Sequence, residues 1–148
     1  MWRGHIDIVQ WMINKGANNF DDGLEGACRG GYIDCVQLMI NKGANDWNGG
    51  LEGACKEGNI DIVQLMIEKG ADYWDDGLRC ACYRGHIDIV HLMIKKGATA
   101  VNGGLYGACM GEHIDIIQLM IEKGGKVMKR MSEFSQPIQE YLKKHMKN

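Results

Sequence analysis

Apolar and polar positions recur along this chain with a period of 27 residues. One motif of six residues, Gly-His-Ile-Asp-Ile-Val in its most frequent form, occurs five times, at residues 4–9, 31–36, 58–63, 85–90 and 112–117. A Lys-Gly pair follows each run at a constant offset, at Lys15-Gly16, Lys42-Gly43, Lys69-Gly70, Lys96-Gly97 and Lys123-Gly124. A fixed period of this length is typical of a solenoid, in which each repeat buries its apolar face against its neighbours.

Each repeat predicts two short helices. In residues 75–98, Leu78, Ala81 and Cys82 have the i, i+3, i+4 spacing of one apolar helix face, and Gly85 ends that helix. The second helix is apolar on most sides, as expected for a helix that packs against several neighbours. The polar residue near the start of each first helix is expected to be its N-cap: Asp21, Asn48, Asp75 and Asn102.

Small residues also recur inside the first helix, with glycine at Gly26, Gly53 and Gly107. A glycine there weakens a helix by about 1 kcal/mol relative to alanine, and isolated helices of this length are marginal. We therefore expect these glycines to allow close approach between neighbouring helices. The methionines that repeat with the period are expected in the core: Met12, Met39, Met66, Met93 and Met120.

Four of the six cysteines occur once per repeat, at Cys28, Cys55, Cys82 and Cys109. Packed helices lie roughly 8–10 Å apart, whereas a disulfide needs Cα atoms within about 7 Å. Equivalent cysteines are therefore expected to be buried, unpaired residues in a reducing compartment, which favours a cytoplasmic location. Cys80, Cys82 and His86 fall short of the four converging ligands of a structural metal site, so no metal is predicted.

The segment Gly-His-Ile-Asp-Ile-Val-x-Leu-Met-Ile-x-Lys-Gly-Ala at residues 85–98 resembles the second half of an ankyrin repeat. Leu78, Ala81 and Cys82 match the first-helix core positions of that family, and the resemblance covers residues 4–124. It implies an all-α, ankyrin-like helical repeat solenoid of helix-turn-helix units. The usual repeat has about 33 residues and a Thr-Pro-Leu-His motif that is missing here, so little or no β-hairpin is expected. Short repeats of this kind, with truncated hairpin loops, resemble those in ankyrin proteins of large DNA viruses, which would place the chain in the host cell cytoplasm.

The ends of the array depart from the period. Residues 1–124 are predicted to form the repeat array, with a partial first repeat at 1–20 and about four repeats of 27 residues after it. The partial repeat lacks its first helix, which leaves Trp2 and Trp11 uncovered, so the chain is expected to be a fragment or to have that end covered by something. Residues 125–148 predict a C-terminal capping helix, with Pro137 in its first turn.

Charge narrows the choice of partners. The chain has a net charge of −2, but residues 126–148 hold six basic and two acidic residues, which leaves −6 on the repeats. An acidic body binds phosphates poorly, so nucleic acid is not expected as a partner. No apolar run is long enough to cross a membrane. His5, His86 and His113 recur at helix starts, and no catalytic motif stands outside the repeat, so no enzyme activity or cofactor is predicted.

Two positions on the first helix lie off the apolar stripe, four residues apart and on one face. They vary between repeats while the core positions hardly change: Glu25, Arg29, Glu52, Lys56, Arg79, Tyr83, Tyr106 and Met110. In ankyrin-like stacks the corresponding face lines a concave groove that holds partners. Tyrosine and arginine are common in interface hot spots, which favours the end from Arg79 to Met110, and ordinary solvated side chains are the alternative.

The sequence therefore predicts a non-catalytic adaptor or scaffold that binds another protein of unknown identity through its first-helix face. A structural or self-assembling repeat segment, or a fragment of a longer array, is the alternative. Self-association would use the uncovered N-terminal end. Phe20, Trp47 and Trp74 recur in the linkers, where they are either buried or exposed, and their regular spacing favours a structural role.

Overall fold

The computed structural model describes residues 4–127 and 131–146. These residues form ten α-helices and one short 3-10 turn, and no β-strand occurs among them. The elements are α1 (Gly4–Asn14), α2 (Phe20–Gly30), α3 (Ile33–Asn41), α4 (Trp47–Glu57), α5 (Ile60–Lys69), α6 (Trp74–Arg84), α7 (Ile87–Lys96), α8 (Val101–Gly111), α9 (Ile114–Glu122), η1 (Met131–Glu133) and α10 (Gln136–His145). The predicted all-α solenoid of helix-turn-helix repeats is confirmed. Trp2 lies outside the described residues.

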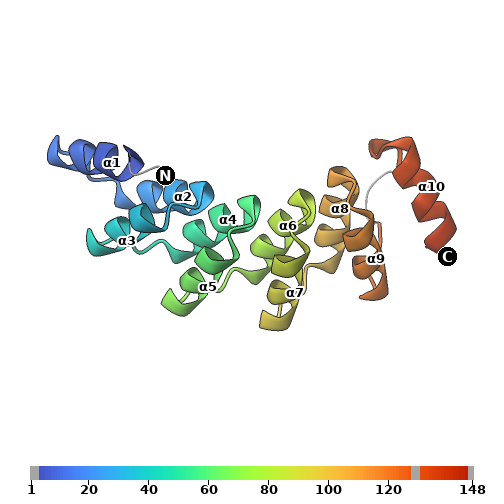
Figure 1. The fold of residues 1–148 in the computed structure, drawn as a ribbon. Coiled ribbons are helices and arrows are strands. Elements are labelled where there is room, and N and C mark those ends of the chain that lie inside the picture. The colour runs from blue at the N-terminus through green and yellow to red at the C-terminus, as the bar shows by residue number, and fades with distance from the viewer. Residues whose placement is uncertain (1–3, 128–130, 147–148) are drawn as a thin grey trace. The chain divides into compact units, whose positions relative to one another are not determined.

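The chain divides into two compact units, with unit 1 spanning residues 1–73 and unit 2 spanning residues 74–148. In unit 1, α2 pairs with α3 and α4 pairs with α5, while α2 also stacks directly against α4 (Figure 1). We call α2 and α4 inner helices and α3 and α5 outer helices. By its place in the period α1 is an outer helix, and it packs against α3.

Unit 2 has the same plan. The inner helices α6 and α8 stack on each other, and each pairs with its own outer helix, α7 or α9 (Figure 1). After α9 the chain continues through η1 to α10. Phe134, Ile138 and Leu142 of this last segment are buried, and the Phe134 ring contacts the Tyr106 ring of α8.

The core of both units follows the predicted stripes. Leu24, Leu51, Leu78 and Leu105 of the inner helices are buried. Each fully buried leucine is worth roughly 1.5–3 kcal/mol of transfer free energy, which is how short, glycine-containing helices become stable together. Of the five repeated methionines, four are buried as predicted, but the prediction for Met12 is wrong because its side chain is 49% exposed.

Left-handed glycines end the inner helices of unit 1. Gly31 and Gly58 have φ angles of 73° and 84° at the C-caps of α2 and α4. This conformation suits glycine because it has no Cβ atom. In unit 2 the C-cap of α8 is Glu112, with a φ of 61°, and it is the only non-glycine residue with a positive φ in the described parts of the chain.

The prediction that Asp21 and Asn48 are the N-caps of α2 and α4 is wrong. The side chains of Asn19 and Asp46, each placed before an aromatic residue, cap α2 and α4. Asp21 is instead the second residue of α2, and its Oδ1 accepts hydrogen bonds from the backbone N–H groups of Asn45 and Asp46, at 2.7 and 3.0 Å. Because the short loops have no hairpin partner for their N–H groups, an aspartate or asparagine one repeat earlier accepts these hydrogen bonds.

Candidate functional site

The eight predicted partner-binding residues lie on the inner helices beside the core stripe. We call them the inner-helix surface: Glu25, Arg29, Glu52 and Lys56 in unit 1, and Arg79, Tyr83, Tyr106 and Met110 in unit 2. Each follows directly after a buried leucine or after the cysteine position of the stripe. A residue at that place on a helix turns away from the core, so its side chain is available to solvent.

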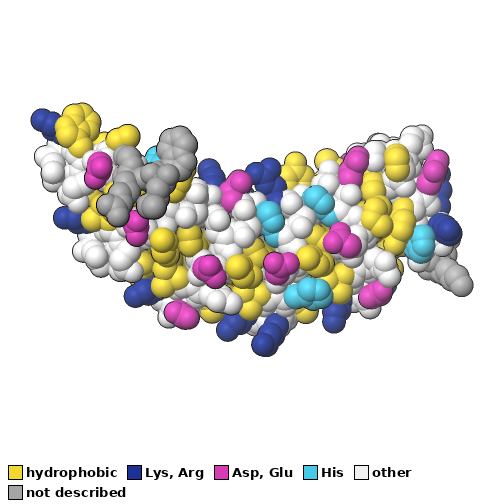
Figure 2. Space-filling view, viewed as in Figure 1, with side chains coloured by type: hydrophobic (Ala, Val, Ile, Leu, Met, Phe, Trp, Pro, Cys, Tyr) yellow, Lys and Arg dark blue, Asp and Glu magenta, His cyan; other side chains and the backbone are white. Residues whose placement is uncertain are grey.

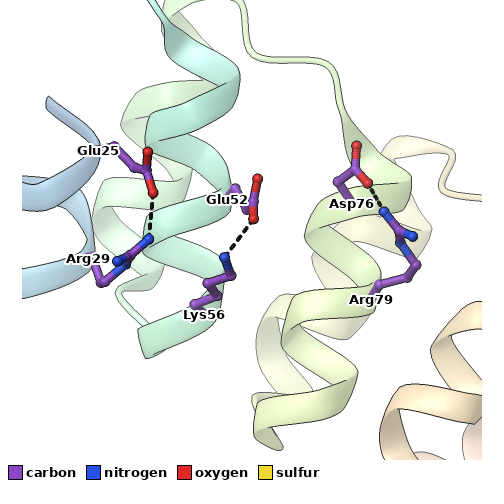
Figure 3. A network of polar contacts seen from close by, with 6 residues as sticks. All are labelled: Glu25, Arg29, Glu52, Lys56, Asp76 and Arg79. Carbon is purple, nitrogen blue, oxygen red and sulfur yellow. Dashed lines mark hydrogen bonds and ion pairs between the residues drawn. The ribbon is translucent and has the colours of Figure 1, made fainter. Parts of the chain in front are cut away.

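In unit 1 the inner-helix surface consists of ion pairs. Arg29 Nη2 lies 2.5 Å from Glu25 Oε1, and Lys56 Nζ lies 2.6 Å from Glu52 Oε1. Figure 3 shows that each pair lies along its own helix, with partners one turn apart. Such i,i+4 pairs stabilise a helix by about 0.2–0.5 kcal/mol. Both pairs are partly exposed, and within each pair the two opposite charges neutralise each other.

In unit 2 the same surface is less polar. Tyr83 is 50% exposed and Met110 is 43% exposed, on α6 and α8 respectively. Arg79 forms an ion pair with Asp76 of its own helix (Figure 3) and keeps much of its side chain in solvent. Unit 2 therefore presents an arginine, a tyrosine and a methionine on neighbouring stacked helices.

Tyr106 differs from the other seven residues. Its hydroxyl donates to Glu133 Oε2 at 3.2 Å, and its ring centroid lies 5.6 Å from that of Phe134. Tyr106 is thus half-buried under the C-terminal segment rather than free on the surface. The sequence could not reveal this contact because Phe134 lies outside the repeat.

Polar residues at the start of the outer helices fix the inner helices in place. Asn59 Nδ2 donates to the Cys28 carbonyl oxygen at 2.9 Å, and His113 Nε2 lies 3.1 Å from the Tyr83 carbonyl oxygen. Both carbonyl groups belong to the last turn of the inner helix one repeat earlier, α2 or α6, where carbonyl groups lack donors within their own helix. His113 therefore has a structural contact, which also holds the backbone that carries Tyr83.

Two aspartates that accept hydrogen bonds from a loop one repeat later have lowered pKa values. The backbone N–H groups of Asp46 and then Asn45 hold the pKa of Asp21 below its ordinary value. In unit 2 the N–H groups of Ala100 and then Thr99 lower the pKa of Asp75 in the same way. Asn48 accepts the equivalent bonds from Asp72 and Tyr73 without carrying a charge. These side chains thus organise the loops.

The repeated cysteines are buried thiols. Burial raises the pKa of Cys28 and Cys82 to about 12, with the nearby Glu25 carboxylate adding to the effect at Cys28, and raises that of Cys109 to about 11. A thiol with such a pKa stays protonated at neutral pH, whereas nucleophilic and metal-binding cysteines are thiolates. Among the described residues, no group of three or more His, Cys, Asp or Glu side chains is placed to hold a metal ion.

The linker aromatics are neither fully buried nor fully exposed. Phe20, Trp47 and Trp74 each occupy the first position of an inner helix and are half-buried. A Cβ atom built at Gly70, the C-cap of α5, would lie 3.9 Å from Cδ1 of the Trp47 ring. This position fits a role in holding the short loop.

The N-terminal end of unit 1 has a hollow of about 250 Å³ between α1, α2 and α3. Its lining includes Val9, Gly26, Ala27, Cys35 and Met39. Hydrophobic side chains also reach the surface over α1 in Figure 2, where Trp11 is 61% exposed. We call this region the N-terminal hollow.

Within each unit the inner helices stack, side chains bond to the loop of the neighbouring repeat, and the positions beside the core stripe vary. This arrangement defines a helical repeat scaffold. The chain matches the family described as ankyrin repeats (3 copies) over residues 1–76 and again over residues 51–131. It therefore belongs to the ankyrin-repeat family, whose members generally bind other proteins and are typically not enzymes. No curated protein matches the chain. Among the helices that the structure describes, none has the length and apolar character needed to cross a bilayer.

Proposed function

We propose that this chain is a non-catalytic adaptor or scaffold that binds another protein through the inner-helix surface. The observation that carries this proposal is the contrast within each inner helix. Its stripe of leucine, alanine and cysteine is buried and nearly constant, whereas the adjacent positions are exposed or half-buried and differ between repeats. A constant frame with a variable surface suits recognition of a macromolecular partner.

The binding energy is expected to come mainly from unit 2. Arginine and tyrosine dominate interface hot spots, and methionine adapts its shape to a partner surface. Arg79, Tyr83 and Met110 combine these properties on two stacked helices. The ion pairs Glu25–Arg29 and Glu52–Lys56 add charge complementarity, which influences specificity and association rate more than affinity.

The partner is proposed to be a protein, and not nucleic acid or a membrane. The repeats carry a net charge of −6, and an acidic surface repels phosphate groups. A cytoplasmic location is proposed from the buried free thiols, which persist in a reducing compartment. The short repeats resemble those of ankyrin proteins from large DNA viruses, and on that resemblance the compartment would be the host cell cytoplasm.

The proposal is tested by affinity capture from cell lysate with mass spectrometry, followed by a titration with the protein that is enriched. The test variant combines Arg79→Ala, Tyr83→Ala and Met110→Ala. Tyr106 is left intact because its ring supports Phe134. We expect the triple variant to lose at least tenfold in affinity.

A matched control combines three exposed outer-helix changes in the same unit: His91→Ala, Lys95→Ala and Gln118→Ala. Both triple variants should have the circular dichroism spectrum and thermal midpoint of a folded chain. A partner that binds the inner-helix variant as tightly as wild type, or loses affinity equally with the control, would contradict the proposal.

A further inference from the structure

Two asparagines in the first turns of inner helices are followed by glycine, Asn48 in α4 and Asn102 in α8. An asparagine before glycine is prone to lose its side-chain amide, because glycine has no side chain to hinder attack by its backbone nitrogen. Both asparagines belong to the sequence Asn-Gly-Gly-Leu, at residues 48–51 and 102–105. Their local sequences are thus matched, but the structure surrounds them differently.

The attacking nitrogen is held by a cap in α4 and lacks one in α8. The Gly49 N–H donates to Oδ1 of the N-cap Asp46 at 2.9 Å. The N-cap of α8 is Ala100, and no side chain of the described residues caps that helix at the Gly103 N–H. The nitrogen must lose its proton to react, so α4 must first break a bond that α8 does not make. A cap bond of ordinary strength changes such a rate about fivefold.

Charges beside the two nitrogens act in the same direction. A Cβ atom built at Gly49 would lie 2.5 Å from Asp46 Oδ2, whereas one built at Gly103 would lie 3.0 Å from Arg79 Cδ. A nearby carboxylate opposes the negative charge that the nitrogen acquires on losing its proton, and an arginine favours it. Arg79 also pairs with Asp76, which offsets part of its charge.

The two asparagine side chains are also held to different degrees. Asn48 Oδ1 accepts from the N–H groups of Asp72 and Tyr73 at 2.9 and 3.1 Å, and its Nδ2 donates to Asp72 Oδ1 at 3.2 Å. Within the described residues, the Asn102 side chain has one hydrogen bond, from the Lys126 N–H at 2.8 Å. Asn48 is half-buried and Asn102 is exposed. Asn102 therefore loses fewer contacts when its side chain rotates toward the neighbouring nitrogen.

We propose that Asn102 is a site of spontaneous deamidation and that the fold protects Asn48. The Gly103 nitrogen attacks Asn102 Cγ, so that the N–Cγ bond forms and the Cγ–Nδ2 bond breaks. The Nδ2 group leaves as ammonia and takes the proton of the Gly103 N–H. Water then opens the cyclic imide at either of its two carbonyl groups, which gives aspartate or isoaspartate at position 102.

The two products differ in their effect on α8. Aspartate occupies this position in α2 and α6, where Asp21 and Asp75 accept hydrogen bonds from loop N–H groups. This product therefore keeps the bond to Lys126, and its charge in the first turn complements the helix dipole. Isoaspartate adds a backbone CH₂ group, which displaces the side chain from the Lys126 N–H and disrupts the helix start. Deamidation thus alters the tie between α8 and the segment after α9.

The test incubates the full chain in mildly alkaline buffer made with H₂¹⁸O, below its thermal midpoint. The oxygen of each new carboxylate comes from the water, so mass spectrometry of proteolytic peptides measures ¹⁸O at each asparagine and separates it from deamidation during digestion. Chromatography resolves the aspartate and isoaspartate peptides. We expect Asn102 to convert at least about fivefold faster than Asn48. In denaturing urea the two should react at similar rates, because their flanking glycines are the same.

Exchanging the caps gives a matched pair of variants. Ala100→Asp supplies α8 with the carboxylate that Asp46 supplies to α4, and the two cap residues have similar φ angles of −74° and −78°. This variant should slow Asn102 about fivefold and leave Asn48 unchanged, while Asp46→Ala should speed Asn48 by about the same factor. Circular dichroism at the incubation temperature confirms that each variant is folded.

Three results would overturn the proposal. Asn48 could react as fast as Asn102 in the folded chain, or Ala100→Asp could leave the Asn102 rate at the wild-type value. Both asparagines could also stay unlabelled in the folded chain while reacting in urea, in which case the helix alone protects them and the missing cap has no effect.

Discussion

The inner helices α2 and α8 are built on the same repeat but differ in what covers their outward sides. In unit 2, the segment after α9 places Phe134 against Tyr106 and buries Ile138 and Leu142. In unit 1, a Cβ atom built at Gly26 would meet no heavy atom of the described residues within 4 Å, and Ile8, Trp11 and Met12 of α1 are exposed. A solenoid repeat has two faces to cover, and the described residues cover the outward side of α8 but not that of α2.

The largest expected effect comes from opening the covered end. Phe134→Ala should lower the free energy of unfolding by about 3 kcal/mol, because a buried aromatic side chain is lost and a cavity remains. Urea denaturation followed by circular dichroism measures the loss. The comparison variant is Trp11→Ala in α1, where the side chain is 61% exposed, and it should change stability by no more than about 0.5 kcal/mol. Equal losses for the two variants would show that both ends are covered alike.

A second test compares one glycine position on two inner helices. Gly53→Ala should destabilise the chain by about 2 kcal/mol, because the new Cβ atom meets the Glu25 carbonyl oxygen and the stacked backbones must separate. Gly26→Ala should stabilise it by about 0.5–1 kcal/mol through helix propensity alone. The two midpoints in urea should therefore move in opposite directions. A loss of stability in Gly26→Ala would mean that α2 is already stacked against something in the free chain.

The sequence predicted the frame of this fold because the frame repeats. Leu78, Ala81 and Cys82 lie in the core as their spacing indicated, and Gly53 does allow close approach. The misplacement of Met12 has a simple cause, since a residue that a repeated neighbour buries is exposed where the described residues contain no such neighbour. Periodicity reports what one repeat does to the next and cannot describe the ends.

Part of the candidate site could not be predicted from the sequence either. The position of Tyr106 in the repeat did not predict that Phe134 and Glu133 would contact it, because both residues lie outside the repeats. The role of Asp21 was misjudged for a different reason, because its hydrogen bonds reach a loop one repeat away. An aspartate near a helix start is usually a cap, and only the three-dimensional arrangement shows that this one accepts bonds from Asn45 and Asp46.

A smaller effect is expected at the end of α8. Glu112 adopts the left-handed conformation that glycine occupies at the same place in α2 and α4. Glu112→Gly should raise the free energy of unfolding by about 0.5–1 kcal/mol, because the steric cost of a side chain in this conformation exceeds the entropy cost of glycine. Thermal denaturation checks the result, with Glu122→Gly as a control that should destabilise. A Glu112→Gly variant no more stable than wild type would show that the glutamate makes a compensating contact.

The smallest expected effect on stability concerns the aspartates that accept hydrogen bonds from the loops. Alternate repeats have an asparagine at this position, as Asn48 and Asn102 show. The pKa of Asp75 is lowered in the folded chain by the N–H groups of Ala100 and Thr99. A lowered folded-state pKa means that the stability contribution is complete above the unfolded-state value, about 3.9, and is lost as the pH falls through the folded-state value. Asp75→Ala should cost about 0.5 kcal/mol at pH 7, well below the roughly 1.5–3 kcal/mol of a bond to a charged group, because water screens the exposed carboxylate. Asp75→Asn should keep most of the stability, as Asn48 does in its own repeat, and should lose less on acidification than wild type. Urea midpoints at pH 7 and pH 3 measure both effects, and an unchanged acid sensitivity in Asp75→Asn would show that other carboxylates control the pH dependence of this unit.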